Sequence, residues 1–142
     1  MAKKKSDREA FAEAVKSAVT IEPMALEEEF VRLPADIASF NEQFAEALEE
    51  FLRAKRNEER TYARLYMSER EGAEKKTTEA MVRHTVELHP DYEAATLRRI
   101  MAEVEKARLR GVLDALSAKR DSLISVGAQI RDERRHGPTI LD

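Results

Sequence analysis

The chain has 142 residues, 37% of them charged, and contains no cysteine and only four glycines and four prolines. The lack of cysteine excludes disulfide bonds, thiolate zinc sites and a cysteine nucleophile. No apolar run reaches the ~18 residues of a membrane-spanning helix, and the basic start is not followed by the apolar stretch of a secretory signal. We therefore expect a cytoplasmic protein without membrane contact. Few glycines and prolines predict an all-α fold with long helices.

Residues 1–33 are expected to form an acidic, flexible N-terminal segment with a short helix. Apolar side chains at Phe11, Val15, Ala18 and Val19 give one stripe over residues 7–19. Residues 20–33 are interpreted as a linker with at most one turn of helix, which ends where Pro34 takes the first position of the next helix.

Residues 34–135 predict a helical hairpin domain. Its first helix spans about residues 34–71, since no proline or glycine follows Pro34 before Gly72, and Gly72 is its expected C-cap. A short helix with Thr77 as N-cap and contacts from Met81, Val82, Val86 and Leu88 should follow, ending at Pro90. Residues 136–142 remain as a C-terminal tail.

The last helix should span about residues 91–133, with apolar side chains at Leu97, Ile100, Met101, Val104, Val112, Leu116, Leu123, Val126 and Ile130. Positions 112 to 130 form a heptad-like seam that Lys119 interrupts. Gly111 and Gly127 either mark close helix contacts or are weak points of the helix. The two long helices should pack antiparallel to bury their facing stripes, and the thin core favours oligomerisation through further helix packing.

An enzyme is not expected. His84, His89 and His136 lack the spacing of a metal-binding helix motif, and the sequence has no glycine-rich phosphate loop and no nucleophile elbow. Abundant carboxylates on a highly charged helical chain are typical of a solvated face. We therefore predict no catalytic residue, no metal and no cofactor.

Charge is distributed unevenly along the chain. Residues 9–52 carry two basic and eleven acidic side chains, whereas the chain from residue 53 onward has a net charge of +3. The densest basic feature is an arginine stripe at Arg53, Arg56, Arg60 and Arg64, about 16 Å long on a helix. With Lys55, Tyr62, Lys75 and Lys76 nearby, the composition is typical of a single-stranded DNA site, in which cations follow phosphates and bases stack on rings.

A solvated helix face is the alternative. Glu49 with Arg53, and Lys55 with Glu59, are four residues apart and could form surface ion pairs. Tyr62 and Tyr66 also fit the apolar register of a core, so spacing alone leaves both interpretations open.

Several short segments resemble the UvsY family of phage recombination mediators in order and spacing. They are Tyr62-Ala-Arg-Leu-Tyr66, a break at Gly72, Lys76-Thr-Thr-Glu-Ala-Met-Val, Asp91-Tyr-Glu, and a long helix with Gly111-Val-Leu-Asp-Ala-Leu116 and Ile130-Arg131. The resemblance covers about residues 33–135. The family's basic pair falls on Tyr62 and Arg64, so the arginine is kept, a tyrosine replaces the lysine, and Arg60 could supply the missing charge.

The resemblance implies a ring-like homo-oligomer that binds single-stranded DNA. Such a protein would help a RecA-like recombinase displace the single-strand-binding protein, in the host cytoplasm if the chain is phage-encoded. The alternative function is a helical scaffold or assembly chaperone that contacts only protein.

Overall fold

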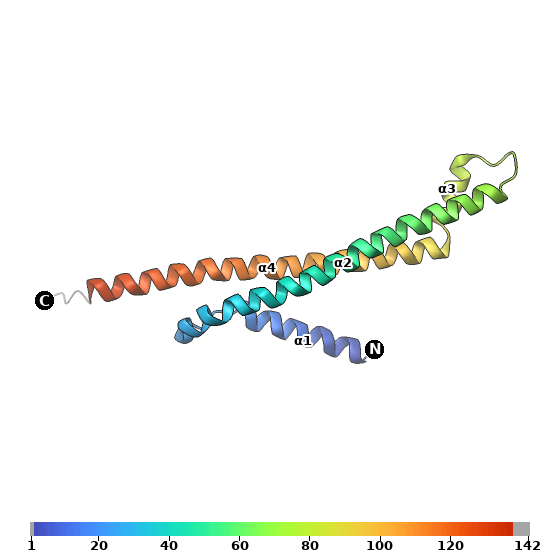
Figure 1. Cartoon of the computed structure of the whole chain (residues 1–142). Helices are drawn as coiled ribbons and strands as arrows, with labels where there is room; N and C mark the ends of the chain where they lie inside the picture. The colour runs from blue at the N-terminus through green and yellow to red at the C-terminus, as the bar shows by residue number, and fades with distance from the viewer. Residues whose placement is uncertain (1, 138–142) are drawn as a thin grey trace. The chain divides into compact units, whose positions relative to one another are not determined.

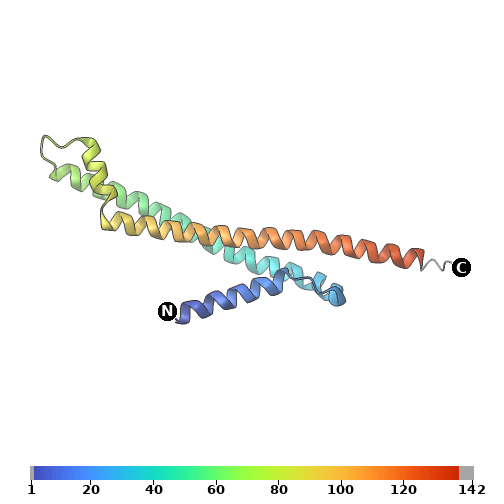
Figure 2. The same ribbon diagram turned by 180° about the vertical axis from the view of Figure 1, so that it is seen from behind.

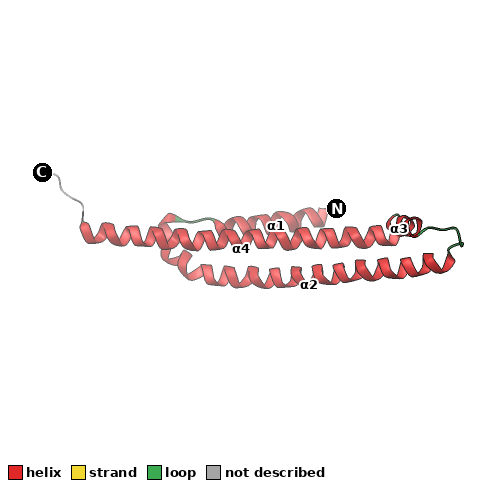
Figure 3. Cartoon of the chain, turned by 90° about the horizontal axis from the view of Figure 1, so that it is seen from above, coloured by secondary structure: helices red, strands yellow, loops and turns green. Residues whose placement is uncertain are grey.

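The described part of the chain consists of helices and short connections (Figure 1). The structure is a computed structural model and describes residues 2–137. Helix α1 spans Ala2–Val19, the 3-10 helix η1 Pro23–Ala25, α2 Leu26–Gly72, α3 Glu79–Glu87 and α4 Pro90–His136. No strand occurs within these residues, which Figure 3 draws as red helices joined by green loops. The predicted all-α class is confirmed. Met1 lies outside the described residues, and so do residues 138–142 of the predicted C-terminal tail.

The chain divides into two compact units. Unit 1 contains the residues up to Glu42 together with those from Arg110 onward, and unit 2 contains Gln43–Leu109. Helices α2 and α4 each contribute residues to both units. Within residues 2–137, no helix has the length and apolar character needed to cross a membrane.

Unit 1 is a packing of α1 with the first part of α2 and the last part of α4. The rings of Phe11 and Phe40 meet edge to face, with centroids 6.4 Å apart. Leu116 and Leu123 are fully buried, and Val112 is nearly so, which confirms these three positions of the predicted seam. Figure 2 shows α1 in blue ending at the connection that leads into α2. The N-terminal helix therefore docks on its own chain.

Helix α2 begins earlier than predicted. Its first residue is Leu26, so the linker prediction for residues 26–33 is wrong and Pro34 lies inside the helix instead of at its first position. A proline within a helix removes one backbone hydrogen bond and costs about 3 kcal/mol. Glu27, Glu28 and Glu29 occupy the first turn, where carboxylates interact favourably with the helix dipole. Burial of Leu33 and Phe40 in unit 1 adds packing on both sides of Pro34.

Unit 2 contains an antiparallel pair formed by the second part of α2 and the first part of α4. Phe51 contacts Lys106, Glu58 pairs with Arg99, and Arg64 pairs with Asp91, so rising residue numbers on α2 meet falling numbers on α4. The side chains buried between them are mostly small, namely Ala54, Leu65, Ala95, Ala102 and Leu109. Alanine at these positions lets the two backbones approach closely. This part of the predicted hairpin is confirmed.

Helix α3 lies between the end of α2 and the start of α4 (Figure 1). Val82 and Val86 are buried as predicted, but Met81 and Leu88 are 57% and 81% exposed, so the expectation that they supply core contacts is wrong. The N-cap is Thr78, not Thr77: its hydroxyl oxygen accepts a 3.3 Å hydrogen bond from the backbone N–H of Met81.

The helix ends also differ from prediction. Gly72 is the last residue of α2 and keeps a negative φ, so it is not a left-handed C-cap. Gly137, with φ of 59°, follows α4 and takes that conformation instead. At the start of α4, His89 Nδ1 accepts a 3.1 Å hydrogen bond from the backbone N–H of Asp91, which satisfies one of the free donors of the first turn.

The apolar residues predicted for the first part of α4 do not face α2. Leu97, Ile100, Met101 and Val104 are 43–57% exposed, whereas Ala95, Ala102 and Leu109, spaced seven residues apart, are buried. Leu97 is two residues from Ala95, which is a rotation of about 200° around a helix. In unit 2, α4 therefore has two apolar faces on opposite sides, and α2 covers the one with the smaller side chains.

Candidate nucleic-acid interface

The arginine stripe lies on the outer face of α2 in unit 2. Arg53, Arg56, Arg60 and Arg64 are all exposed. Ala54 and Leu65, each one residue from a stripe arginine, are buried on the side toward α4. Burial of those two residues fixes the rotation of α2 about its axis. The four arginines are therefore exposed as a row of guanidinium groups about 16 Å long.

Two arginines of the stripe form ion pairs. Arg53 Nη2 donates to Glu49 Oε1 at 2.5 Å, and Arg64 Nη2 lies 3.5 Å from Asp91 Oδ2. All four side chains are more than half exposed. Ion pairs this exposed contribute little to stability and exchange readily for other partners. The predicted pair of Glu49 with Arg53 is confirmed, whereas the described residues contain no pair between Lys55 and Glu59.

Arg56 and Arg60 lie at the centre of the stripe. Neither forms an ion pair or a side-chain hydrogen bond with any residue in the described part of the chain, and both are exposed. A guanidinium group carries five N–H donors in a fixed plane and remains charged at all physiological pH values. The pair is therefore available to bind phosphate or carboxylate groups from another molecule.

Acidic residues near the stripe turn toward α4. Glu58 accepts hydrogen bonds from Arg99 Nε at 2.5 Å and from the Thr96 hydroxyl at 2.9 Å, and its side chain is 13% exposed. Glu50 Oε1 lies 3.4 Å from Arg98 Nη2. Two carboxylates that could compete for the stripe arginines are thus held by arginines of α4.

The tyrosines do not share the face of the stripe. Tyr62 is two residues from both Arg60 and Arg64, or about 200° around the helix. Its ring meets Tyr92 edge to face at 5.4 Å and stacks on Tyr66 at 6.3 Å. The Tyr66 hydroxyl donates to Glu79 Oε1 at 3.2 Å. These rings join α2, α3 and α4 within unit 2, and a role for Tyr62 in stacking on bases stays a prediction.

The three candidate lysines lie apart from the stripe. Lys55 is two residues from Arg53 and points to another side of α2, where it is exposed. Lys75 and Lys76 form the turn between α2 and α3, and both are exposed. The structure thus brings together the four arginines, while the lysines add positive charge at other surfaces of unit 2.

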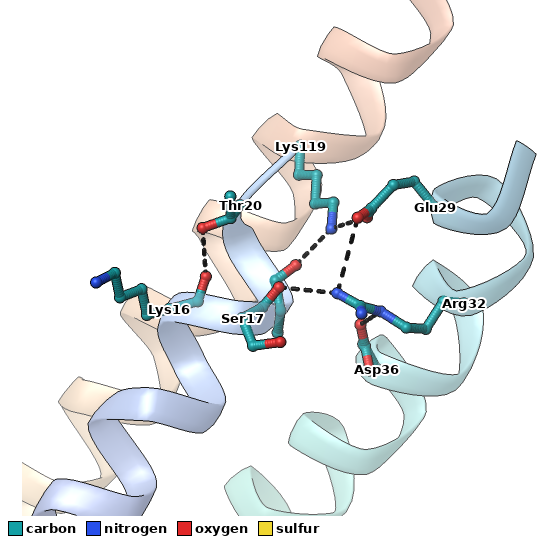
Figure 4. Close-up of polar contacts among 8 residues, drawn as sticks. Lys16, Ser17, Thr20, Glu29, Arg32, Asp36 and Lys119 are labelled. Atoms are coloured by element: carbon teal, nitrogen blue, oxygen red, sulfur yellow. Dashed lines mark hydrogen bonds and ion pairs between the residues drawn. The ribbon is translucent and has the colours of Figure 1, made fainter. Parts of the chain in front are cut away.

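A buried polar cluster in unit 1 was missed by sequence reasoning, which treated Lys119 as an interruption of a seam. The Lys119 ammonium donates a 2.6 Å hydrogen bond to the carbonyl oxygen of Ala18 and forms an ion pair with Glu29 (Figure 4). Arg32 donates to the carbonyl oxygen of Ser17 at 2.8 Å. Two cations therefore satisfy carbonyl groups at the C-terminus of α1, where the helix dipole favours positive charge.

The pKa of Glu29 lies below its ordinary value of 4.5. The hydrogen bond from Lys119 is the main cause, and the positive charges of Lys119 and Arg32 add to it, against the opposing effect of burial. Lys119 of α4 binds both the carbonyl oxygen of Ala18 in α1 and the carboxylate of Glu29 in α2, so it links the three helices at one point. Lys119 and Arg32 are both ion-paired with Glu29 within the cluster, so we interpret the cluster as structural.

The histidines form no metal site in the described part of the chain, where no group of three metal-ligating side chains occurs. His84 lies 3.6 Å from Glu87, His89 accepts from Asp91, and His136 contacts the carbonyl oxygen of Asp132. Each contact joins residues no more than four positions apart, so all three histidines serve their own helix or helix end.

Comparison of the chain with protein-family models, with curated proteins and with solved structures finds no match.

Proposed function

We propose that this protein binds single-stranded DNA along the arginine stripe of α2. The observation that supports the proposal is the pair Arg56 and Arg60, exposed side by side on one helix face without an acidic partner in the described residues. Arg53 and Arg64 extend the row, because their exposed ion pairs can be exchanged for phosphates. The resulting contacts are directed at the backbone and carry little sequence preference.

The proposed biological role is that of a recombination mediator, as the resemblance to the UvsY family implies. The protein would hold a single strand while a RecA-like recombinase replaces the single-strand-binding protein. One stripe of four arginines is a weak site. Several copies in a homo-oligomer would hold one strand at several points, and linked sites gain affinity through effective concentration.

Binding of oligo-dT at low salt tests the proposal. We expect the wild-type protein to bind and the double variant Arg56→Ala, Arg60→Ala to lose most of its affinity. The dependence of log affinity on log salt should become shallower by about 0.7 for each phosphate that the variant no longer neutralises.

The matched control is Arg83→Ala with Arg98→Ala. It also removes two exposed arginines from unit 2, but both have carboxylate partners, in Glu79 and Glu50. Absence of binding by the wild type, or equal losses in the two double variants, would rule out the stripe as the DNA site.

A scaffold that contacts only protein is the second candidate function. It is favoured by the exposed apolar residues of α4, because large exposed apolar patches mark interaction surfaces. Light scattering with and without oligo-dT separates the two functions. A scaffold would form an oligomer whose mass and size do not respond to DNA.

A further inference from the structure

The outer face of α4 in unit 2 is apolar and has no partner among the described residues. Leu97, Ile100, Met101 and Val104 are 57%, 43%, 56% and 52% exposed, and they follow the i, i+3, i+4, i+7 spacing of a single helix face. Ala94 and Ala107, three residues beyond each end, are exposed too. The four larger side chains form what we call the outer stripe. It lies opposite the residues that α4 buries against α2, so the hairpin itself cannot cover it.

Charged residues stand at both ends of the outer stripe and have opposite signs. Glu93 precedes it and Arg108 follows it, and both project on the same side of α4 as the stripe, given the helical period. Glu93 is seven residues before Ile100 and Arg108 is seven residues after Met101, so the two charges are equally far from the midpoint of the stripe. Glu93 has no ion pair among the described residues, and Arg108 is 44% exposed beside Glu105.

We propose that the outer stripe is a self-association surface, on which α4 of a second copy packs antiparallel about a two-fold axis between Ile100 and Met101. An axis at this point places Leu97 level with Val104 of the second copy and Ile100 level with its Met101. Ile100 and Met101 each also lie within about 1.5 Å, along the helix axis, of their own equivalents in the second copy. The same axis places Glu93 opposite Arg108 of the second copy, twice over. The apolar stripe and both charged ends are therefore complementary to themselves in this one arrangement.

The charges select the antiparallel arrangement. A parallel pair in register would place Glu93 against Glu93 and Arg108 against Arg108, and like charges in close apposition disfavour that pairing. On one flank of the stripe, Arg98 also comes within about one helical turn of Glu105 of the second copy in the antiparallel pair. An isologous contact of this kind closes on itself, so this surface alone yields a dimer, and a ring would need a second, different contact.

Cysteine cross-linking of the full chain tests the orientation, because the protein has no cysteine of its own. In the proposed pair, Ile100→Cys faces itself and should form a disulfide dimer. Leu97→Cys and Val104→Cys are seven residues apart, or about 10 Å along the helix, which is beyond the reach of a disulfide. Neither variant should cross-link to itself, and a mixture of the two should cross-link. Self-linked dimers of Leu97→Cys and of Val104→Cys would show parallel pairing and overturn the proposal.

Sedimentation equilibrium tests the surface. The wild type should dimerise as concentration rises, and Met101→Glu should weaken that association at least tenfold. Met81→Glu is the matched control, since Met81 is equally exposed in unit 2 but lies on α3. Circular dichroism should show unchanged helix content in both variants. A wild type that stays monomeric at all concentrations, or one that associates as strongly after Met101→Glu, would overturn the proposal.

Charge reversal tests the ends. Glu93→Arg and Arg108→Glu should each weaken the dimer, because like charges then meet across the axis, and the double reversal should restore it. Weakening without restoration would contradict the pairing of Glu93 with Arg108. These measurements contain no nucleic acid, so they can succeed or fail independently of the proposed DNA binding.

Discussion

Lys119 and Glu29 form an ion pair from which water is almost excluded, with side chains 1% and 8% exposed. The same ammonium group donates to the carbonyl oxygen of Ala18. Burial makes each partner depend on the other, because a buried charge that loses its counter-charge is strongly unfavourable.

Glu29→Gln should therefore destabilise the protein by about 3 kcal/mol, the lower end of the cost of breaking a buried pair from one side. Lys119 would keep its bond to Ala18 but lose its counter-charge. Denaturant unfolding followed by circular dichroism measures the change. Glu28→Gln is the control, since Glu28 is the exposed neighbour in the same turn and its loss should cost less than about 0.5 kcal/mol. Equal effects of the two substitutions would contradict the role assigned to the pair.

The same pair predicts a dependence of stability on pH. The pKa of Glu29 is lower in the folded protein than its ordinary value of 4.5, so the folded state binds fewer protons at this site than the unfolded state. The stabilisation is fully present above about pH 4.5 and is lost as the pH falls through the lowered pKa of the folded state. The difference in unfolding free energy between wild type and Glu29→Gln should shrink over this acidic range. A difference that stays constant down to about pH 3 would contradict the prediction.

Lys119 illustrates why this cluster could not be predicted from the sequence. Its position in a heptad seam was evident, but a lysine in a seam usually indicates an interruption. The structural role of Lys119 depends on the C-terminus of α1, where Ala18, 101 residues away in the chain, supplies the carbonyl oxygen that accepts its hydrogen bond. No local pattern indicates that contact.

The first part of α4 shows a second limit of sequence reasoning. Both Leu97 with Val104 and Ala95 with Ala102 repeat at seven residues, so periodicity alone offers two candidate seams. The choice of the larger side chains for the core was wrong, because α2 packs closely against the alanines and leaves the larger residues exposed. By contrast, the helix end at Gly72 and the helix start at Pro90 were predicted well, since glycine and proline act on the backbone locally.

The arginine stripe was predictable in its spacing, because a helix without internal glycine between residues 53 and 64 fixes the relative directions of its side chains. The ion-pair partners of these arginines were not predictable from the sequence, except for the local pair of Arg53 with Glu49. Asp91 reaches Arg64 only through the antiparallel packing of α4.

Tyr62 should matter more for stability than for DNA affinity. Tyr62→Leu removes the edge-to-face contact with Tyr92 and the stack on Tyr66, each a kind of contact worth about 0.5–1.5 kcal/mol. We expect a decrease of about 1–2 kcal/mol in unfolding free energy. The decrease in oligo-dT affinity should be smaller than the one that Arg56→Ala with Arg60→Ala causes.

Tyr66→Phe serves as the control for this substitution. It keeps the stacked ring and removes only the exposed hydrogen bond to Glu79, so stability should change by less than about 1 kcal/mol. If Tyr62→Leu abolished DNA binding and left stability unchanged, Tyr62 would be a base-stacking residue and its packing against Tyr92 incidental.

Gly111 is a weak point of α4. It lies in the interior of the helix, and a Cβ added there would meet no atom of the described residues within 4 Å. Alanine is favoured over glycine in a helix interior by about 1 kcal/mol. Gly111→Ala should therefore raise the unfolding free energy by about that amount. A Cβ added at Gly127, by contrast, would lie 3.7 Å from the ring of Phe30, which is an ordinary van der Waals contact.

Gly137→Ala should change stability in the opposite direction, although the added atom also meets no neighbour within 4 Å among residues 2–137. Gly137 has a φ of 59°, a left-handed conformation that costs a residue with a Cβ about 1–2 kcal/mol. The backbone N–H of Gly137 donates a 3.1 Å hydrogen bond to the carbonyl oxygen of Glu133. If alanine does not adopt the left-handed conformation, this hydrogen bond is lost and the last turn of α4 should fray. Thermal unfolding of Gly111→Ala and Gly137→Ala, measured side by side, separates the effect of backbone conformation on stability from the effect of the space around the added Cβ. A decrease in stability on Gly111→Ala would mean that another surface lies against that residue in solution.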